Sequence, residues 1–99
     1  MHGEYKMPAG KLIVIDLDVQ NGLLAGVRLS GDFFLEPDSA LQRINAALEG
    51  QSEHADEARL ALAVREALPA DVMMYGISPE AIAVTVRRAV HWDPPRDSH

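Results

Sequence analysis

Cysteine is absent from this 99-residue chain, which excludes a disulfide framework, a cysteine nucleophile and a thiolate metal site. Its absence is typical of proteins in a reducing compartment, so we expect a cytoplasmic location. No apolar run approaches the roughly 20 residues of a membrane-spanning helix. The first ten residues, MHGEYKMPAG, lack the apolar core of a secretory signal peptide. These absences predict a soluble, intracellular protein.

Positive charge is also scarce. Nine lysine and arginine residues stand against fifteen aspartate and glutamate residues, which gives a formal net charge of -6 at pH 7 and a pI near 5.0. Proteins that bind nucleic acids usually carry a basic patch, so this balance argues against a nucleic-acid partner. Hydrophobic residues make up 47% of the chain, which is enough for one small domain to bury a core.

No catalytic or cofactor-binding constellation stands out. The sequence contains neither of the glycine-rich phosphate loops, G-x-x-x-x-G-K-[ST] and G-x-G-x-x-G. The four histidines are His2, His54, His91 and His99. None pairs with another at the i, i+4 spacing of a helical metal site, so we expect solvated side chains and no metal site. The serines have no histidine at a recognisable triad spacing.

Two pairs of neighbouring residues could carry chemistry but have simpler interpretations. Asp16 and Asp18 share one face of a predicted strand, and such carboxylates can bind a cation or perform acid–base chemistry. We interpret them as the solvated face of the strand, because Arg28 shares that face and could pair with Asp16. Met73 and Met74 are interpreted as core filler.

The first third of the chain predicts an antiparallel hairpin. Residues 1–10 contain Pro8 and Gly10 and are expected to form an irregular arm. Residues 11–19, KLIVIDLDV, alternate as a strand does, and a second alternating segment, LLAGVRLSG, follows at 23–31. These two segments are expected to pair as the base of a small sheet.

The length of the hairpin loop is decided by the facing pattern. The Asn-Gly pair ending at Gly22 suggests a two-residue turn, but such a turn would set Ile15 opposite Arg28. A three-residue loop at 20–22 sets Ile15 opposite Val27 and puts both apolar sets on one face. We therefore predict the three-residue loop, with Gly22 in the left-handed position of a bulge.

The rest of the chain predicts helices with one short strand. The expected helices are 37–49, 53–68 and a third from Ser78-Pro79 to residue 91 or 92, and the short strand is 71–75. A tail at 93–99 has no apolar content and is expected to be disordered. The fold class is therefore α+β: a small antiparallel sheet built on an N-terminal hairpin, with about three helices packed on one face. In this division 1–10 is an arm, 11–92 the domain and 93–99 the tail.

Several motifs occur in a fixed order along the chain. Residues 4–50 read EYKMPAGKLIVIDLDVQNGLLAGVRLSGDFFLEPDSALQRINAALEG, with a K-x-P-x-G-K start, then S-G-D-F-F, then a proline-led acidic helix that ends in A-L-x-G. The residues that carry this pattern are Lys6, Pro8, Gly10, Lys11, Ser30, Gly31, Asp32, Phe33, Phe34, Glu36, Pro37, Leu48 and Gly50. Together they resemble the accessory domain of lipoate–protein ligases, and GISPEAIAVTVRRAV is similar to that family's closing helix. Ala9 departs from the pattern, which has a second glycine there.

The resemblance implies a non-catalytic accessory subunit. Lipoate–protein ligases activate lipoate with ATP to lipoyl-AMP and then transfer the lipoyl group to a lysine of an acceptor domain. In this family the catalytic domain holds ATP, magnesium and lipoate, and the accessory domain packs against it. A chain that begins inside the accessory pattern is expected to need a separate catalytic subunit. It is expected to bind no cofactor alone and to contain no catalytic residue.

The same motifs supply the candidate partner-proximal or substrate-proximal residues. They are Lys6, Pro8, Gly10, Lys11, Ser30, Gly31, Asp32, Phe33 and Phe34. Lys6 and Lys11 could approach nucleotide phosphates or a carboxylate when the arm docks; the alternative is plain surface lysines. Of the adjacent phenylalanines, which would face opposite sides of a strand, we expect one to anchor the hairpin to helix 37–49 and the other to lie at the partner surface. Asp32 is expected to fix the turn that presents them.

Two other classes of function stay open from the sequence. One is a free-standing α+β module that binds a small acid or effector without a ligase partner. The other is an enzyme in its own right, which is disfavoured because no nucleophile, metal set or phosphate loop is visible. A catalytic ligase subunit encoded next to this chain would favour the accessory role. The acyl substrate of such a partner (lipoate, octanoate or another carboxylic acid) is not specified by this sequence.

Overall fold

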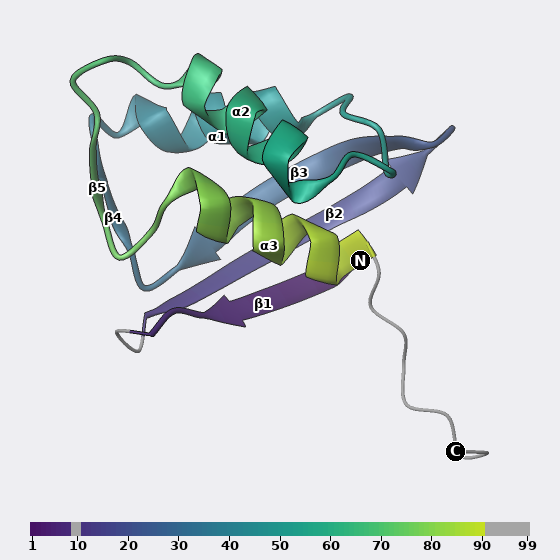
Figure 1. Cartoon of the computed structure of the whole chain (residues 1–99), viewed down its shortest axis with the longest axis horizontal. Coiled ribbons are helices and arrows are strands. Elements are labelled where there is room, and N and C mark those ends of the chain that lie inside the picture. The colour runs from purple at the N-terminus through teal and green to yellow at the C-terminus, as the bar shows by residue number, and fades with distance from the viewer. Residues whose placement is uncertain (9–10, 91–99) are drawn as a thin grey trace.

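The chain forms one sheet layer and one helix layer, as shown by a computed structural model that describes residues 1–8 and 11–90 (Figure 1). In chain order the elements are β1 (His2–Lys6), β2 (Leu12–Gln20), β3 (Leu23–Gly31), β4 (Phe34–Glu36), α1 (Ser39–Leu48), α2 (Glu57–Ala67), β5 (Met73–Tyr75) and α3 (Pro79–Val90). The predicted tail at 93–99 and the last residues of the third predicted helix lie outside the described residues. The α+β class and the antiparallel sheet are confirmed.

Strand β1 corrects the expectation of an irregular arm at 1–10. It lies antiparallel beside β2, with His2 opposite Asp16, and the sheet order is β1-β2-β3. Gly3 makes this packing possible, because a Cβ there would lie 2.6 Å from the backbone nitrogen of Ala89 and the backbone oxygen of Thr85 in α3. The strand ends before Pro8, one of the two residues on which the expectation was based.

The β2–β3 hairpin has a two-residue turn, so the predicted three-residue loop is wrong. Asn21 and Gly22 both have positive φ, 54° and 79°, as a type I′ turn requires. Gln20 pairs with Leu23 at the base of this turn. The local Asn-Gly signal was therefore the correct guide to the loop.

A bulge explains why the facing pattern misled. The register shifts between Asp16 and Asp18, where β3 has one residue more than β2, and Gly26 there has a φ of 61°. Beyond the bulge Ile15 pairs with Leu29 instead of the predicted Val27. The extra residue in β3 returns the apolar side chains of β2 and β3 to the same face of the sheet, so a longer loop is not needed.

The helices cover one face of the three-stranded sheet. Helix α3 packs on β1 and β2, α1 packs on β3, and α2 packs against both helices (Figure 1). The fully buried core side chains include Ile13, Ile15, Ile44, Leu48, Leu60, Val64, Ile82 and Val86. No helix of the described residues is long and apolar enough to cross a membrane.

Helices α2 and α3 begin at side-chain caps, whereas the residue before α1, Asp38, makes no capping hydrogen bond through its side chain. The Ser78 hydroxyl accepts a hydrogen bond from the backbone N–H of Ala81 at 3.1 Å, which confirms the predicted start of α3. The Asp56 carboxylate accepts one from Arg59 at 2.8 Å, so α2 begins later than the predicted residue 53. Helix α1 begins at Ser39, two residues after the predicted Pro37.

A second sheet has two strands: β4, which follows β3, and β5, which precedes α3. Strands β4 and β5 lie side by side at one end of the molecule and pair antiparallel, with Leu35 opposite Met74 (Figure 1). The predicted strand at 71–75 is confirmed in its last three residues. Leu35 is buried and Met74 is partly buried against the core, so one face of this small sheet belongs to the domain interior.

Candidate docking site

Several chain segments meet at one end of the three-stranded sheet, which we call the loop end: residues 6–8, residues 11–12, residues 31–33 and residues 75–77. The backbone N–H of Met7 donates to the Lys11 carbonyl at 2.8 Å, and the N–H of Asp32 donates to the Leu12 carbonyl at 2.8 Å. At Gly76, a Cβ would lie 3.0 Å from the Lys11 side chain and 3.3 Å from the Asp32 carbonyl. Lys11 of the K-x-P-x-G-K motif and Asp32 of the S-G-D-F-F motif therefore both lie beside Gly76, which is about 45 residues after Asp32 in the chain.

The S-G-D-F-F turn depends on its glycine. Gly31 has a φ of 141°, and a Cβ there would overlap the carbonyl oxygen of Leu12. A side chain at this position would therefore separate β3 from β2 where the turn begins. The turn itself is held by the backbone N–H of Asp32.

The two phenylalanines of the turn have different surroundings. Phe33 is half-buried and packs against the hydrophobic core, whereas Phe34 is 54% exposed. The two adjacent rings therefore differ in burial. The anchoring of the hairpin to helix 37–49 by one ring and the partner contact of the other both stay predictions.

The exposed phenylalanine does not stand alone. On the outer face of the β4–β5 sheet, Phe34 lies opposite Tyr75 and Glu36 lies opposite Met73. The rings of Phe34 and Tyr75 are tilted by 46°, with centroids 6.1 Å apart. Tyr75 and Met73 are 50% and 48% exposed, so the interpretation of Met73 as core filler is wrong. Sequence reasoning missed these two partners, although their i, i+2 spacing in the predicted strand 71–75 already put them on one face.

The other predicted site residues are spread over the same end of the molecule. Lys6 ends β1 opposite Leu12, and Lys6, Pro8 and Lys11 are exposed. Ser30 is exposed on β3 opposite Val14, on the face of the sheet away from the helices. Gly10 lies outside the described residues.

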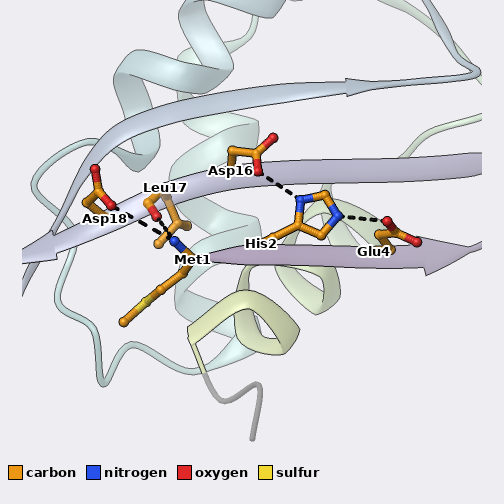
Figure 2. A network of polar contacts seen from close by, with 6 residues as sticks. All are labelled: Met1, His2, Glu4, Asp16, Leu17 and Asp18. Carbon is orange, nitrogen blue, oxygen red and sulfur yellow. Dashed lines mark hydrogen bonds and ion pairs between the residues drawn. The ribbon is translucent and has the colours of Figure 1, made fainter. Parts of the chain in front are cut away.

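A separate polar cluster lies at the start of β1 (Figure 2). The Nδ1 of His2 lies 2.8 Å from the Asp16 carboxylate, and its Nε2 lies 2.7 Å from the Glu4 carboxylate. The hydrogen bonds to Glu4 and Asp16 raise the pKa of His2 above its usual 6.5, because only the imidazolium form donates from both nitrogens. Asp16 on β2 thus pairs with His2 on β1 and not with Arg28, which lies opposite it on β3. The predicted Asp16–Arg28 pair is not among the ion pairs of the described residues.

The acidic side chains do not gather into a cation site. Among residues 1–8 and 11–90, no three histidine, aspartate or glutamate side chains are arranged to hold a metal ion. Asp18, the second carboxylate of the pair on β2, lies 3.9 Å from the amino group of Met1. The polar cluster therefore ties β1 to β2 in this structure.

Comparison with known proteins supports the family resemblance. No family model and no curated protein matches the chain. Among solved structures, it is similar to a chain from the structural analysis of an archaeal lipoylation system, a bipartite lipoate protein ligase and its E2 lipoyl domain from Thermoplasma acidophilum. The two chains are 26% identical with a TM-score of 0.66, and the match covers 88% of this chain and 98% of the other.

The fold is thus an α+β domain that is similar to a chain of an archaeal lipoylation system. More particularly, the likeness confirms the resemblance of this chain to the accessory-domain family of lipoate–protein ligases.

Proposed function

We propose that this chain is the non-catalytic accessory subunit of a two-subunit lipoate–protein ligase. The observation that carries the proposal is the likeness to the archaeal bipartite ligase system, which spans nearly the whole of both chains. The described residues of the K-x-P-x-G-K motif and the S-G-D-F-F turn, which carry the resemblance in sequence, lie at the loop end. Two independent comparisons, one of motifs and one of folds, therefore support the same family.

In this proposal the accessory subunit acts by binding. The catalytic subunit holds ATP, magnesium and lipoate, and joins the lipoate carboxylate to the adenylyl group of ATP with release of pyrophosphate. It then transfers the lipoyl group from lipoyl-AMP to an acceptor lysine with release of AMP. The accessory chain docks on the catalytic subunit and stabilises the arrangement that performs the first step, a use of binding free energy for positioning.

The test is a lipoyl-adenylation assay that follows pyrophosphate release from ATP and lipoate. Three samples are compared: the candidate catalytic subunit alone, this chain alone, and the two mixed. We expect activity only in the mixture, rising with the concentration of this chain until the partner is saturated. Circular dichroism of each subunit confirms that both are folded, so that an inactive mixture is informative.

The opposite result has a clear meaning. If a folded catalytic subunit gains no activity and shows no binding, the accessory role with that partner is wrong. The free-standing binding module would then be the better hypothesis, and an unbiased pull-down would be the next experiment. Octanoate in place of lipoate in the same assay tests which acyl substrate the assembled enzyme activates.

A further inference from the structure

We propose that the outer face of the β4–β5 sheet, formed by Phe34, Glu36, Met73 and Tyr75, is the docking face for the catalytic subunit. The partner surface that fits it is an apolar pocket bordered by lysine or arginine side chains. This inference rests on the proposed function and adds to it the surface and the chemistry of the contact.

Strand geometry puts these four side chains on one surface. Successive residues of a strand point to opposite faces, and here the inward residues Leu35 and Met74 are both covered by the domain. The outward residues form two cross-strand pairs, Phe34 with Tyr75 and Glu36 with Met73. The face is therefore continuous, although its residues come from segments about 40 positions apart.

The face concentrates exposed apolar side chains. The described residues include six large hydrophobic residues that are about half exposed to solvent: Met1, Leu23, Phe34, Leu62, Met73 and Tyr75. Three of the six share this small face. Single exposed apolar residues are ordinary on protein surfaces, but a cluster with two aromatic rings is typical of a binding site. Aromatic side chains are also enriched among the residues that dominate binding free energy.

Charge selects a heterologous partner over a second copy of this chain. Glu36 lies on the face itself, and the exposed carboxylates of Asp38 and Asp71 follow at the same end, because β4 and β5 run antiparallel. A symmetric dimer through this face would bring together two chains that each carry a formal net charge of -6, and these chains would repel each other. A partner with cationic side chains around an apolar pocket neutralises the same end.

The opposite end of the face gives it a direction. The Lys11 side chain lies beside Gly76, which directly follows Tyr75. Beyond one end of the docking face lie carboxylates, whereas Lys11 and the exposed Asp32 both lie beyond the other end. This difference between an acidic end and an end of mixed charge favours one orientation of the bound partner.

The experiment measures binding of the catalytic subunit to four variants by isothermal titration calorimetry. Phe34→Ala and Tyr75→Ala remove the two rings, and Leu62→Ala and Leu23→Ala are matched controls. Leu62 and Leu23 are 52% and 46% exposed but lie on α2 and at the β2–β3 turn. We expect each ring variant to raise the Kd about tenfold or more and each control to change it less than about twofold. The concentration for half-maximal adenylation activity should shift in parallel.

A fifth variant, Glu36→Lys, tests the charge and covers the possibility that a ring variant unfolds. It replaces an exposed side chain, so the fold should be kept, while binding weakens at low salt and this loss shrinks as salt is added. Thermal melts of every variant separate loss of folding from loss of binding.

The outcomes distinguish this inference from the proposed function. If the unmodified chain neither binds nor activates the catalytic subunit, the proposed function fails. If it does both, and Phe34→Ala, Tyr75→Ala and Glu36→Lys bind as tightly as the unmodified chain, the docking face is wrong and the proposed function stands. A dimer of this chain alone in analytical ultracentrifugation that Phe34→Ala dissociates would assign the face to a second copy and overturn the inference.

Discussion

The two sheets of the molecule differ in the faces that they turn to solvent. The three-stranded sheet buries Ile13, Ile15 and Leu17 under the helices. Its other face carries mostly polar side chains, namely His2, Glu4, Lys6, Asp16, Arg28 and Ser30, with Leu12 and Val14 half-buried among them. The two-stranded sheet also buries one face, but its other face carries two aromatic rings and a methionine.

This difference shows that folding of a sheet does not require apolar side chains on its outer face. An antiparallel sheet packed on one side is stable with a polar outer face, as the three-stranded sheet shows. The exposed rings of the small sheet gain little from folding, because about half of their surface stays in water. The docking proposed above would account for their placement.

The largest predicted effect breaks the three-stranded sheet. Gly3→Ala should destabilise the fold by about 3 kcal/mol, because its Cβ would press on the α3 backbone, which cannot move aside as a flexible side chain can. Urea denaturation followed by circular dichroism measures this loss. Gly50→Ala is the control: its Cβ would meet no atom within 4 Å, and its positive φ of 81° leaves a cost of about 1 kcal/mol. Equal midpoints for the unmodified protein and Gly3→Ala would mean that β1 does not pack under α3.

The next prediction compares the two adjacent phenylalanines where β4 begins. Phe33→Ala should cost about 2 kcal/mol, less than for a fully buried ring, because Phe33 packs against the core but is only half-buried. Phe34→Ala should cost less than about 1 kcal/mol, most of it from the lost contact with the Tyr75 ring. Thermal melts of the two variants check this order. The reverse order would show that the ring on the outer face is the one that holds the fold.

A smaller effect is expected at the outer edge of β3. The side-chain oxygen of Asn45 in α1 accepts a hydrogen bond from the Leu29 N–H at 3.1 Å. Because β3 is an edge strand of the sheet that the described residues form, no neighbouring strand is present on its outer side to accept this hydrogen bond. Asn45→Ala should cost about 1 kcal/mol by leaving that donor unpaired. Gln42→Ala, at an exposed position of the same helix, is the control and should change the denaturation midpoint little. A similar midpoint for both variants would mean that water replaces the Asn45 contact.

Sequence patterns predicted those parts of the fold that depend on local signals. The strand at 11–19 and the capped start of α3 each depend on a few neighbouring residues, and the structure contains both features. The Asn-Gly pair was also a correct local signal, but the prediction set it aside in favour of a three-residue loop. The β2–β3 register was missed because a bulge breaks the alternation on which the prediction was based. Strand β1 was missed because its support comes from α3, more than 80 positions away, through a contact that only glycine permits.

The candidate site divides in the same way. The motif residues Lys11, Gly31 and Asp32 could be proposed together from the sequence, and they do lie together at the loop end. Tyr75 and Met73 could not be joined to Phe34 from the sequence, because the pairing of β4 with β5 connects two short segments with no strong signal of their own. Long-range pairing between short strands is the part of a fold that periodicity cannot reveal.

The smallest predicted effect concerns the polar outer face of the three-stranded sheet. The pKa of His2 is raised in the folded protein by its hydrogen bonds to the Glu4 and Asp16 carboxylates, relative to 6.5 in the unfolded chain. The His2 contribution to stability is therefore complete below pH 6.5 and is lost as the pH rises through the folded-state pKa. His2→Gln should remove this dependence, so that the urea midpoint of the variant falls less than that of the unmodified protein on going from acidic to mildly alkaline pH.

His54→Gln removes another exposed histidine and should leave the His2 contribution in place. If the unmodified protein and His2→Gln show the same change of midpoint with pH, the cluster at the start of β1 does not stabilise the sheet, and its polar residues serve only to keep this face in water. The difference between the two outer faces would then depend on solvation alone.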